Sequence, residues 1–297
     1  MRLVSFNING IRARLHQLQA LIDTQQPDVI GLQETKVQNS EFPITDVEAM
    51  GYHVFYHGQK GHYGVALLCR QAPQEVFYGF PDDEEDAQCR MIGVRLLAED
   101  GEAVTVWNGY FPQGENVTHP TKFPNKERFY GQLARLLNEQ YRPDERLAIM
   151  GDFNISPEDQ DIGIGEANRK RWLREGKTSF QPIEREWLEG VKAWGLTDSY
   201  RLSYPQTDDR FSWFDYRSKG FNQEPKRGLR IDYILVTKAL ADQTTGAGID
   251  YDLRSMERPS DHAPIHGRYF FHPWKKTLAL PYRRLMELNK RVFPKLN

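Results

Sequence analysis

Several short apolar runs in this chain end abruptly in polar side chains. Residues 147–150 are all apolar and are followed by Gly151, Asp152 and Asn154. Such a run predicts a buried strand, and a glycine before small polar residues is typical of a strand end. Extended backbone would point Asp152 and Asn154 to the same side. Taken alone, the stretch is most simply an ordinary strand exit, because Asp and Asn are common there.

The same pattern recurs along the chain. Residues 3–8 predict a strand that ends around Asn7, and residues 29–32 predict a second strand that runs into Glu34. Further strands are predicted at residues 104–108, before Tyr110; at residues 230–236, around Asp232; and at residues 265–271, after Asp261 and His262. Because the pattern recurs, chance is a poor explanation for polar residues at so many strand ends.

Helical periodicity separates these strands. Leu15, Leu18 and Leu21 recur at helical spacing and predict a helix over about residues 12–25. Similar spacing predicts a helix after Pro124 and another that carries Trp187. Additional strands are predicted at residues 54–56, 64–68 and 91–97. Because strands dominate and helices are interspersed, the predicted class is α/β, with two packed sheets and helices outside them.

Composition narrows the class of protein. The chain has 297 residues, enough for one large domain or two small ones. Lys and Arg total 39 against 41 Asp and Glu, so an anionic partner must be met by local patches of positive charge. The two cysteines, Cys69 and Cys89, cannot form a disulfide scaffold and suit a reducing compartment.

Targeting signals are not evident in the sequence. The first residues lack the apolar region and cleavage site of a signal peptide. Nowhere do about 18 apolar residues run uninterrupted, so no membrane span is expected. We therefore expect a cytoplasmic protein, and we expect it to be a monomer.

Polar residues from six places in the chain lie where predicted strands end. They are Asn7, Glu34, Tyr110, Asp152, Asn154, Asp232, Asp261 and His262. Each has a bland explanation, such as a turn cap, a buried hydrogen bond or a solvated loop. As a group they are harder to dismiss, because catalytic groups tend to lie on strand ends and loops above a rigid sheet.

Phosphodiester hydrolysis suits this set of side chains. A hard divalent cation prefers oxygen ligands, and Glu34 is the strongest ligand candidate, with Asn7 beside it. An attacking water needs a base and an orienting group, and Asp152 with Asn154 suits these two roles.

The remaining polar residues fit the phosphate side of the same reaction. His262 could contact a phosphate oxygen, with Asp232 or Asp261 fixing its tautomer. Tyr110 could hydrogen-bond the phosphate or act near the leaving group. Other chemistries fit poorly, because the chain contains neither a P-loop nor a Gly-x-Ser-x-Gly motif, and the glycines near residue 163 lack dinucleotide spacing.

Five ordered blocks carry a resemblance to a known family. Residues 32–36, 109–112, 151–154, 230–233 and 260–264 are similar to the signature blocks of the endonuclease/exonuclease/phosphatase superfamily. Longer stretches, at residues 4–10, 56–68, 108–115, 161–173 and 209–221, resemble its bacterial exonuclease III family of abasic-site endonucleases. The resemblance runs from Met1 to about Phe271.

This resemblance implies a four-layered α/β sandwich of the deoxyribonuclease-I-like kind, with two central mixed sheets flanked by helices. It also implies a Mg²⁺- or Mn²⁺-dependent phosphodiester hydrolase of base-excision repair that cleaves duplex DNA on the 5′ side of abasic sites. Related enzymes add 3′-to-5′ exonuclease activity and removal of 3′ phosphates, so duplex DNA with abasic sites or 3′ ends is the expected partner.

Residue roles are carried over by motif. The implied metal-site residues are Asn7, Glu34, Asp152, Asn154, Asp261 and His262, with Glu34 as the principal ligand. The implied catalytic residues are Tyr110, Asp152, Asn154, Asp232 and His262. In the family pattern Asp152 activates water, Asn154 stabilises the transition state, and His262 contacts the scissile phosphate.

Candidate DNA contacts combine local chemistry with the resemblance. Arg169, Lys170, Arg171 and Arg174 form a basic patch suited to a phosphate backbone, although a solvated helix face is the ordinary reading. Trp213 and Phe214, with Arg217 nearby, could fill the space of a missing base. A core aromatic pair is the alternative for these two rings. Gln113, in another loop, is a further candidate.

The C-terminal segment differs in character. Residues 1–271 are expected to form a single catalytic domain, followed by a basic extension at residues 272–297. Leu285, Leu288 and Val292 could form a helical stripe in this extension. It could contact nucleic acid or simply dock or trail as a terminus.

Two rival functions remain open from the sequence. A relative of the same superfamily could act on inositol phosphates or sphingomyelin, but a small head group needs no basic patch and aromatic pair of this extent. A nucleic-acid-binding module that has lost its chemistry is the second rival. The full set of polar residues disfavours it.

Overall fold

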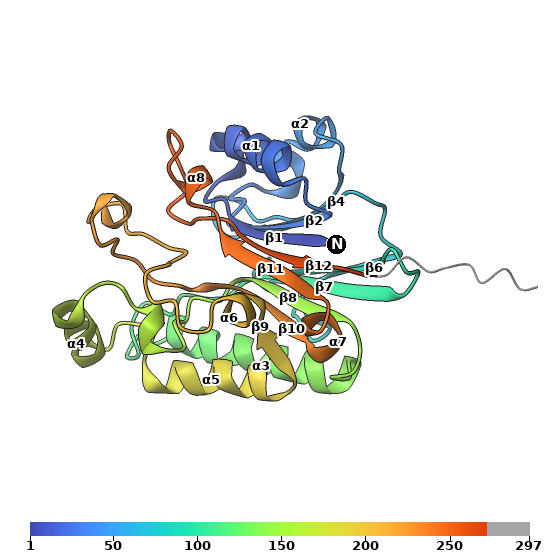
Figure 1. The fold of residues 1–297 in the computed structure, drawn as a ribbon. Coiled ribbons are helices and arrows are strands. Elements are labelled where there is room, and N and C mark those ends of the chain that lie inside the picture. The colour runs from blue at the N-terminus through green and yellow to red at the C-terminus, as the bar shows by residue number, and fades with distance from the viewer. Residues whose placement is uncertain (272–297) are drawn as a thin grey trace, which may run out of the picture.

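Two six-stranded β-sheets packed face to face organise the computed structural model, which describes residues 1–271 (Figure 1). The first sheet has the order β11-β12-β1-β2-β4-β3 and the second has the order β5-β6-β7-β8-β10-β9. Each sheet is mixed, because β1 pairs with β2 and β7 pairs with β8 in parallel, whereas the other neighbours are antiparallel.

The strands of the first sheet are β1 (Arg2–Asn7), β2 (Val29–Gln33), β3 (His53–His57), β4 (Val65–Cys69), β11 (Thr244–Ile249) and β12 (Ile265–Tyr269). Those of the second are β5 (Glu75–Tyr78), β6 (Met91–Leu97), β7 (Ala103–Tyr110), β8 (Leu147–Asp152), β9 (Leu196–Asp198) and β10 (Asp232–Thr237). The α-helices are α1 (Leu15–Gln25), α2 (Ile44–Glu48), α3 (Lys122–Gln140), α4 (Glu166–Glu175), α5 (Pro182–Ala193), α6 (Ser199–Ser203), α7 (Lys238–Ala241) and α8 (Tyr251–Arg254). Short 3₁₀ turns span Ile11–Ala13, Asn39–Glu41, Asp159–Asp161 and Gly220–Asn222.

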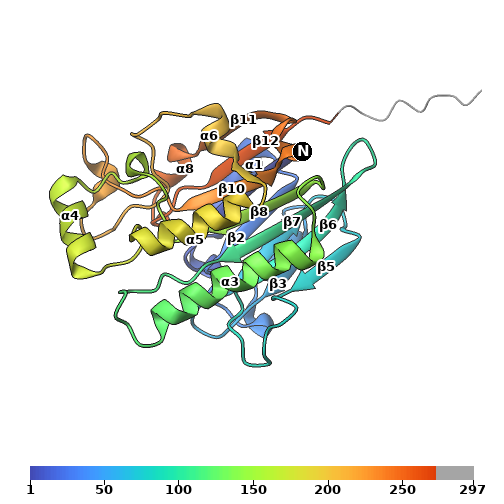
Figure 2. The same ribbon diagram turned by 90° about the horizontal axis from the view of Figure 1, so that it is seen from below.

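Helices cover the outer faces of both sheets. α1, α2 and α8 lie over the first sheet, and α3 and α5 run across the second (Figures 1 and 2). The four-layered α/β sandwich predicted from the sequence is confirmed. Within the described residues, no helix is both long and apolar enough to cross a membrane.

The central strands are buried on both faces, which explains their continuous apolar runs. In β8, Ala148 and Met150 pack between the two sheets. Leu147 and Ile149, on the opposite face of the same strand, pack with buried residues of α3 and α5. A strand covered on one face only would have shown alternating polar positions instead.

A polar contact joins the two sheets beneath the end of β2. The side-chain amide of Asn108 in β7 donates to the carbonyls of Leu32 and Ala66 in the first sheet, at 2.9 and 3.0 Å. Its oxygen accepts from Gln33. Gly31 leaves room for this contact, because a Cβ there would lie 2.7 Å from both Asn108 Oδ1 and Met150 Cε.

The long elements were predicted well and the short edge strands were not. The first predicted strand differs from β1 by one residue at each end, and the predicted helix over residues 12–25 is a 3₁₀ turn followed by α1. The missed strands β5, β9 and β11 are all at sheet edges or short. β11 contains two glycines and lacks an apolar run, which weakens its strand pattern.

The predicted basic extension and its helical stripe lie outside the described residues. The assignment of residues 1–271 to a single catalytic domain stays a prediction. The described residues do form both sheets and the helices that cover them.

We predict that Gly31→Ala lowers the free energy of unfolding by about 1–3 kcal/mol, because the added methyl group overpacks the contact between the sheets. Urea denaturation measures the change. Gly190→Ala is the matched control, since a Cβ at Gly190 in α5 meets no atom within 4 Å. It should raise the free energy of unfolding by about 0.5–1 kcal/mol through helix propensity. Equal denaturation midpoints for Gly31→Ala and the unsubstituted protein would contradict the packing argument.

Candidate active site and metal centre

Polar side chains from strands of both sheets lie together at one end of the sandwich. In the second sheet, Asp152 lies opposite Tyr110 of β7 on one side and opposite Asp232 of β10 on the other. In the first sheet, Asn7 is paired with Gln33, and Glu34 follows directly. These side chains therefore come together because strand register aligns them.

Asn7 connects the two sheets at this end. Its fully buried side-chain amide donates to Glu34 Oε1 at 2.9 Å and to Asp152 Oδ2 at 3.0 Å. One amide thus holds a carboxylate from each sheet at a fixed separation. The sequence prediction that Asn7 lies beside Glu34 agrees with this geometry.

Glu34, Asp152 and His262 form a group that can hold a metal ion. One ligand atom from each lies within 4.8 Å of the others. The two carboxylates supply the oxygen ligands that a hard divalent cation prefers, and the imidazole adds a nitrogen ligand. Burial alone would raise the pKa of Glu34, but the Lys36 ammonium, 2.8 Å from Oε2, and the Asn7 amide lower it. Glu34 is therefore ionised and ready to bind a cation.

Asp152, His262 and Asp232 form a buried chain of ionisable groups. His262 Nδ1 lies 2.9 Å from Asp232 Oδ2, and its Nε2 lies 3.7 Å from Asp152 Oδ2. Burial alone would lower the pKa of His262, but the two aspartates raise it. Asp232, rather than Asp261, is thus the carboxylate that orients the imidazole.

The pKa of Asp152 is raised, first by burial and then by the charges of Asp232 and Glu34, whereas His262 and Asn7 oppose the rise. Within residues 1–271, Asp232 Oδ1 is a buried oxygen with no hydrogen-bond partner. Crowded carboxylates of this kind are relieved by a cation. The electrostatics therefore agree with the donor set in favouring a metal centre.

Two serines hold the loop that carries His262. Ser212 Oγ accepts from the backbone N–H groups of Ile231 and Asp232, and its carbonyl accepts from Ala263. Ser260 Oγ donates to the carbonyl of Asn7 at 2.6 Å and accepts from the His262 N–H. Sequence reasoning assigned no role to either serine, because a hydroxyl that bonds mainly to backbone groups leaves no pattern along the chain.

Tyr110 packs against a cation that the sequence did not identify. The guanidinium of Arg90 lies 4.7 Å from the Tyr110 ring centre and 4.1 Å from that of Tyr63. Burial raises the pKa of the Tyr110 phenol well above its ordinary value, and the carboxylates of Glu34 and Asp152 raise it further. The hydroxyl therefore keeps its proton at neutral pH and can donate a hydrogen bond.

Asn154 is held in a left-handed backbone conformation, with φ of 54°. Its N–H donates to Asp152 Oδ1, and its side-chain amide donates to the carbonyl of Phe111, both at 3.0 Å. Gly151 permits the close approach of β7 just before this turn, since a Cβ there would lie 1.9 Å from the Gly109 carbonyl oxygen. Asp152 and Asn154 are thus fixed relative to each other, although the left-handed backbone of Asn154 departs from the extended conformation on which the sequence prediction relied.

Asp261 lies beside the metal-binding group and does not belong to the three residues that can share one ion. Its Oδ1 accepts from Asn9 Nδ2 at 2.8 Å, and its Oδ2 accepts from Trp213 Nε1 at 3.1 Å. Its place among the metal-site residues stays a prediction. The contacts show that it links the loop after β1 to the loop that carries Trp213.

One predicted DNA contact is corrected by the structure. Phe214 is fully buried and packs edge-on against Phe221 and Tyr251, with ring centres 5.0 and 5.7 Å away. It offers no surface to a ligand, so the core alternative holds for this ring. Trp213 is half-buried and Arg217 is exposed, so both remain candidates.

The predicted basic patch lies on α4, which projects from one end of the molecule (Figure 1). Arg171 and Arg174 are exposed. Arg169 and Lys170 form ion pairs with Glu166, and Arg169 also pairs with Asp159. Arg171 and Arg174 are therefore better placed to meet a phosphate backbone than Arg169 and Lys170, whose charges are already paired with acidic side chains.

Gln113, another predicted DNA contact, is exposed but engaged. Its Nε2 donates to Thr178 Oγ1 at 2.9 Å, and its Oε1 accepts from the Glu115 N–H at 2.7 Å. These bonds fix the loop after β7 against the segment before α5. Any contact with DNA has to be made in addition to them.

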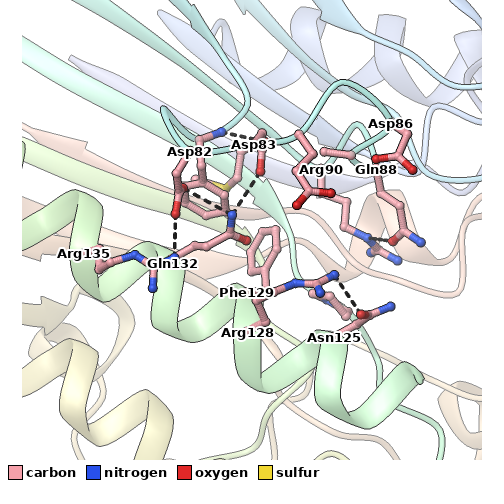
Figure 3. A pocket seen from close by; sticks show the side chains of 15 residues that line it. Asp82, Asp83, Asp86, Gln88, Arg90, Asn125, Arg128, Phe129, Gln132 and Arg135 are labelled. Carbon is pink, nitrogen blue, oxygen red and sulfur yellow. Dashed lines mark hydrogen bonds and ion pairs between the residues drawn. The ribbon is translucent and has the colours of Figure 1, made fainter. Parts of the chain in front are cut away.

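A hollow of about 450 Å³ lies between the loop after β5 and α3 (Figure 3). Its acidic wall includes Asp82 and Asp86, and α3 contributes Arg128 and Arg135. Asp82 pairs with Arg135, which partly neutralises the two walls. Among the described residues that line it, the metal-binding group does not appear. This hollow therefore does not hold the metal-binding group, but it shares Arg90 with the surroundings of Tyr110.

Comparison with known proteins identifies the class. The model of the endonuclease/exonuclease/phosphatase family matches residues 4–262, and the chain belongs to this family.

Within the family, the chain is 57% identical over 269 residues to the exodeoxyribonuclease III of Haemophilus influenzae, a match that spans 91% of this chain and 100% of that protein. Two solved structures are also similar, each over 91% of this chain and 100% of the other. One is the 3′ phosphatase NExo from Neisseria bound to a product DNA hairpin, with 34% identity and a TM-score of 0.81. The other is an AP endonuclease from Archaeoglobus fulgidus, with 30% identity and a TM-score of 0.82.

We predict that Glu34→Gln weakens Mn²⁺ binding on the order of 10-fold or more, because it removes a charged oxygen ligand. Titration calorimetry without DNA measures the affinity directly. Glu186→Gln, at an exposed position of α5, is the charge-matched control and should leave Mn²⁺ binding unchanged. Equal affinities for the two variants would place the metal site elsewhere.

Proposed function

We propose that the chain is a divalent-metal-dependent DNA phosphodiesterase of base-excision repair, an enzyme of the exodeoxyribonuclease III type. It cleaves duplex DNA on the 5′ side of abasic sites and also acts at 3′ ends as an exonuclease and phosphatase. The observation that carries the proposal is the convergence of Glu34, Asp152 and His262 at one end of the sandwich. The relatives named above support the same class of substrate.

Mg²⁺ or Mn²⁺ is the proposed cofactor. Glu34 would be the principal ligand, and the other metal-site residues would be Asn7, Asp152, Asn154, Asp261 and His262. When bound, the cation supplies charge neutralisation at the phosphate and at the departing oxygen. The remaining roles belong to protein side chains.

Asp152 is the proposed base for the attacking water. Burial and the neighbouring acidic groups raise the pKa of Asp152 to about 8, so its ionised form, which predominates above that pH, is a stronger base than an exposed aspartate. Asn154, fixed two residues away, steadies the phosphate. The geometry suits an attack in which base and orienting group do not move relative to each other.

His262 and Tyr110 are proposed to contact the phosphate as hydrogen-bond donors. Asp232 holds the imidazole through Nδ1, so that Nε2 faces the site. The phenol of Tyr110 remains protonated and can donate to a phosphate oxygen. Both groups are preorganised by their neighbours before substrate binds.

DNA is proposed to lie across the end of the sandwich where these loops meet. The proposed contacts are Gln113, Arg169, Lys170, Arg171, Arg174, Trp213 and Arg217. The half-buried ring of Trp213, oriented by Asp261, suits the space left by a missing base. Arg171 and Arg174 suit the phosphate backbone.

A panel of duplexes tests the function. The substrates carry an abasic analogue, a recessed 3′ end or a 3′ phosphate, and each is incubated with Mg²⁺, with Mn²⁺ or with chelator. We expect incision on the 5′ side of the abasic analogue with either metal and none with chelator. Metal-independent cleavage, or no cleavage of any duplex, would overturn the proposal. Activity on sphingomyelin or inositol phosphates alone would favour the rival phosphoesterase.

We predict that Asp152→Asn lowers kcat by a factor on the order of 10³ or more, because the amide cannot accept the proton of the attacking water. Binding to the abasic duplex in chelator should stay within about threefold, since the side chain keeps its shape. Single-turnover kinetics and fluorescence anisotropy measure the two quantities. Turnover that survives the substitution would show that another group activates water.

A further inference from the structure

A lysine and a glutamate are buried together behind the candidate active site. Lys126 in α3 and Glu184 in α5 both have side chains with 0% exposure, and the ammonium forms an ion pair with Glu184 Oε1. Taking two charges out of water is costly, and their attraction offsets this cost only where further hydrogen bonds satisfy both groups. The surroundings of the pair therefore decide what it does.

The ammonium of Lys126 meets three acceptors. Besides Glu184, it donates to the backbone carbonyl of Asn154 at 2.8 Å and to that of Gln113 at 3.3 Å. A lysine ammonium has three N–H donors, so each has a partner. Glu184 in turn accepts from the N–H groups of Ser179 and Gln181. This one ion pair therefore ties the loops after β7 and β8 to the helices α3 and α5.

The contact with Asn154 is the one that reaches the reaction centre. Asn154 has a left-handed backbone, which costs free energy for a residue other than glycine and needs support from its surroundings. Its N–H is fixed by Asp152 and its side-chain amide by Phe111. The carbonyl is the remaining backbone group, and Lys126 holds it.

We propose that Lys126 is a positioning residue for phosphodiester cleavage, acting through the carbonyl of Asn154. By fixing the peptide group that follows Asn154, the ammonium sets the direction of the Asn154 side chain toward the phosphate. The inference rests on the proposed function, in which Asn154 steadies that phosphate. A purely structural ion pair would stabilise the fold without a specific effect on turnover.

The test is a double-mutant cycle on an abasic duplex. Lys126→Met removes the donors while keeping an unbranched side chain. It is made alone and in an Asn154→Ala background, and kcat, KM and duplex binding in chelator are measured. Alone, it should lower kcat on the order of 100-fold, with binding within about threefold. In the Asn154→Ala background it should cause no further loss, because the group it positions is gone.

Leu137→Ala is the control for a general loss of stability. Leu137 lies in the same helix and is fully buried in the core, and its apolar side chain has no donor for the Asn154 carbonyl. The substitution should lower the melting temperature and leave kcat within about twofold at temperatures where the protein is folded. A kcat loss in Leu137→Ala equal to that in Lys126→Met would reduce the lysine to a structural role.

A second variant covers the case in which Lys126→Met does not fold. Lys126→Met combined with Glu184→Gln removes both buried charges, while the glutamine oxygen can still accept from Ser179 and Gln181. It should show the same kcat loss and the same lack of further loss in the Asn154→Ala background. Wild-type kcat in either Lys126 variant, or losses that multiply with Asn154→Ala, would overturn the inference. Failure of the unsubstituted protein to cleave the duplex would instead overturn the proposed function.

Discussion

The site depends on one side-chain amide that faces two carboxylates from different sheets. Asn7 ends β1, and its Nδ2 donates both to Glu34 of the first sheet and to Asp152 of the second. Two acidic side chains brought this close would repel each other in a buried setting. The amide relieves part of that repulsion without adding charge, so the carboxylates stay near each other and remain available to a cation. The packing of the two sheets therefore has to be accurate at this end, and Asn108 with Gly31 provides a second fixed contact beneath it.

The negative charge of these carboxylates is partly balanced by neighbouring cationic side chains. Lys36 pairs with Glu34, and His262 lies between Asp152 and Asp232. Even so, the pKa of Asp152 is raised by burial and by its acidic neighbours. A carboxyl group in that state is stabilised in its ionised form by a nearby cation, and once ionised it is a stronger base than an exposed aspartate. The same crowding thus supports both the proposed metal site and the proposed role of Asp152 as the base.

The sequence identified the three residues that can share one ion, but not the residues that support them. Glu34, Asp152 and His262 were identifiable because each follows or precedes an apolar run, and the runs are long enough to place them on strand ends. Phe214 was misjudged because an aromatic residue in a polar segment looks the same whether the segment folds over it or leaves it exposed. Lys126 was missed because its partner Glu184 is 58 positions away, and no local pattern marks a lysine that will be buried. Edge strands such as β11 were not predicted, because pairing with a neighbouring strand, rather than an apolar run, makes them extended.

Buried ion pairs around this site have a common geometric role. Arg230 is 1% exposed and bonds to Asp161 and Asp198 at 2.6 Å each. It lies two residues before Asp232, so it fixes the start of β10 as Lys126 fixes the turn after β8. Apolar side chains could fill either space at lower desolvation cost, but they could not choose one loop conformation over another by the direction of a hydrogen bond. At both places the segment that is held leads directly into a proposed catalytic residue. The charged supports are therefore best understood as selecting loop geometry, with any gain in stability secondary to that.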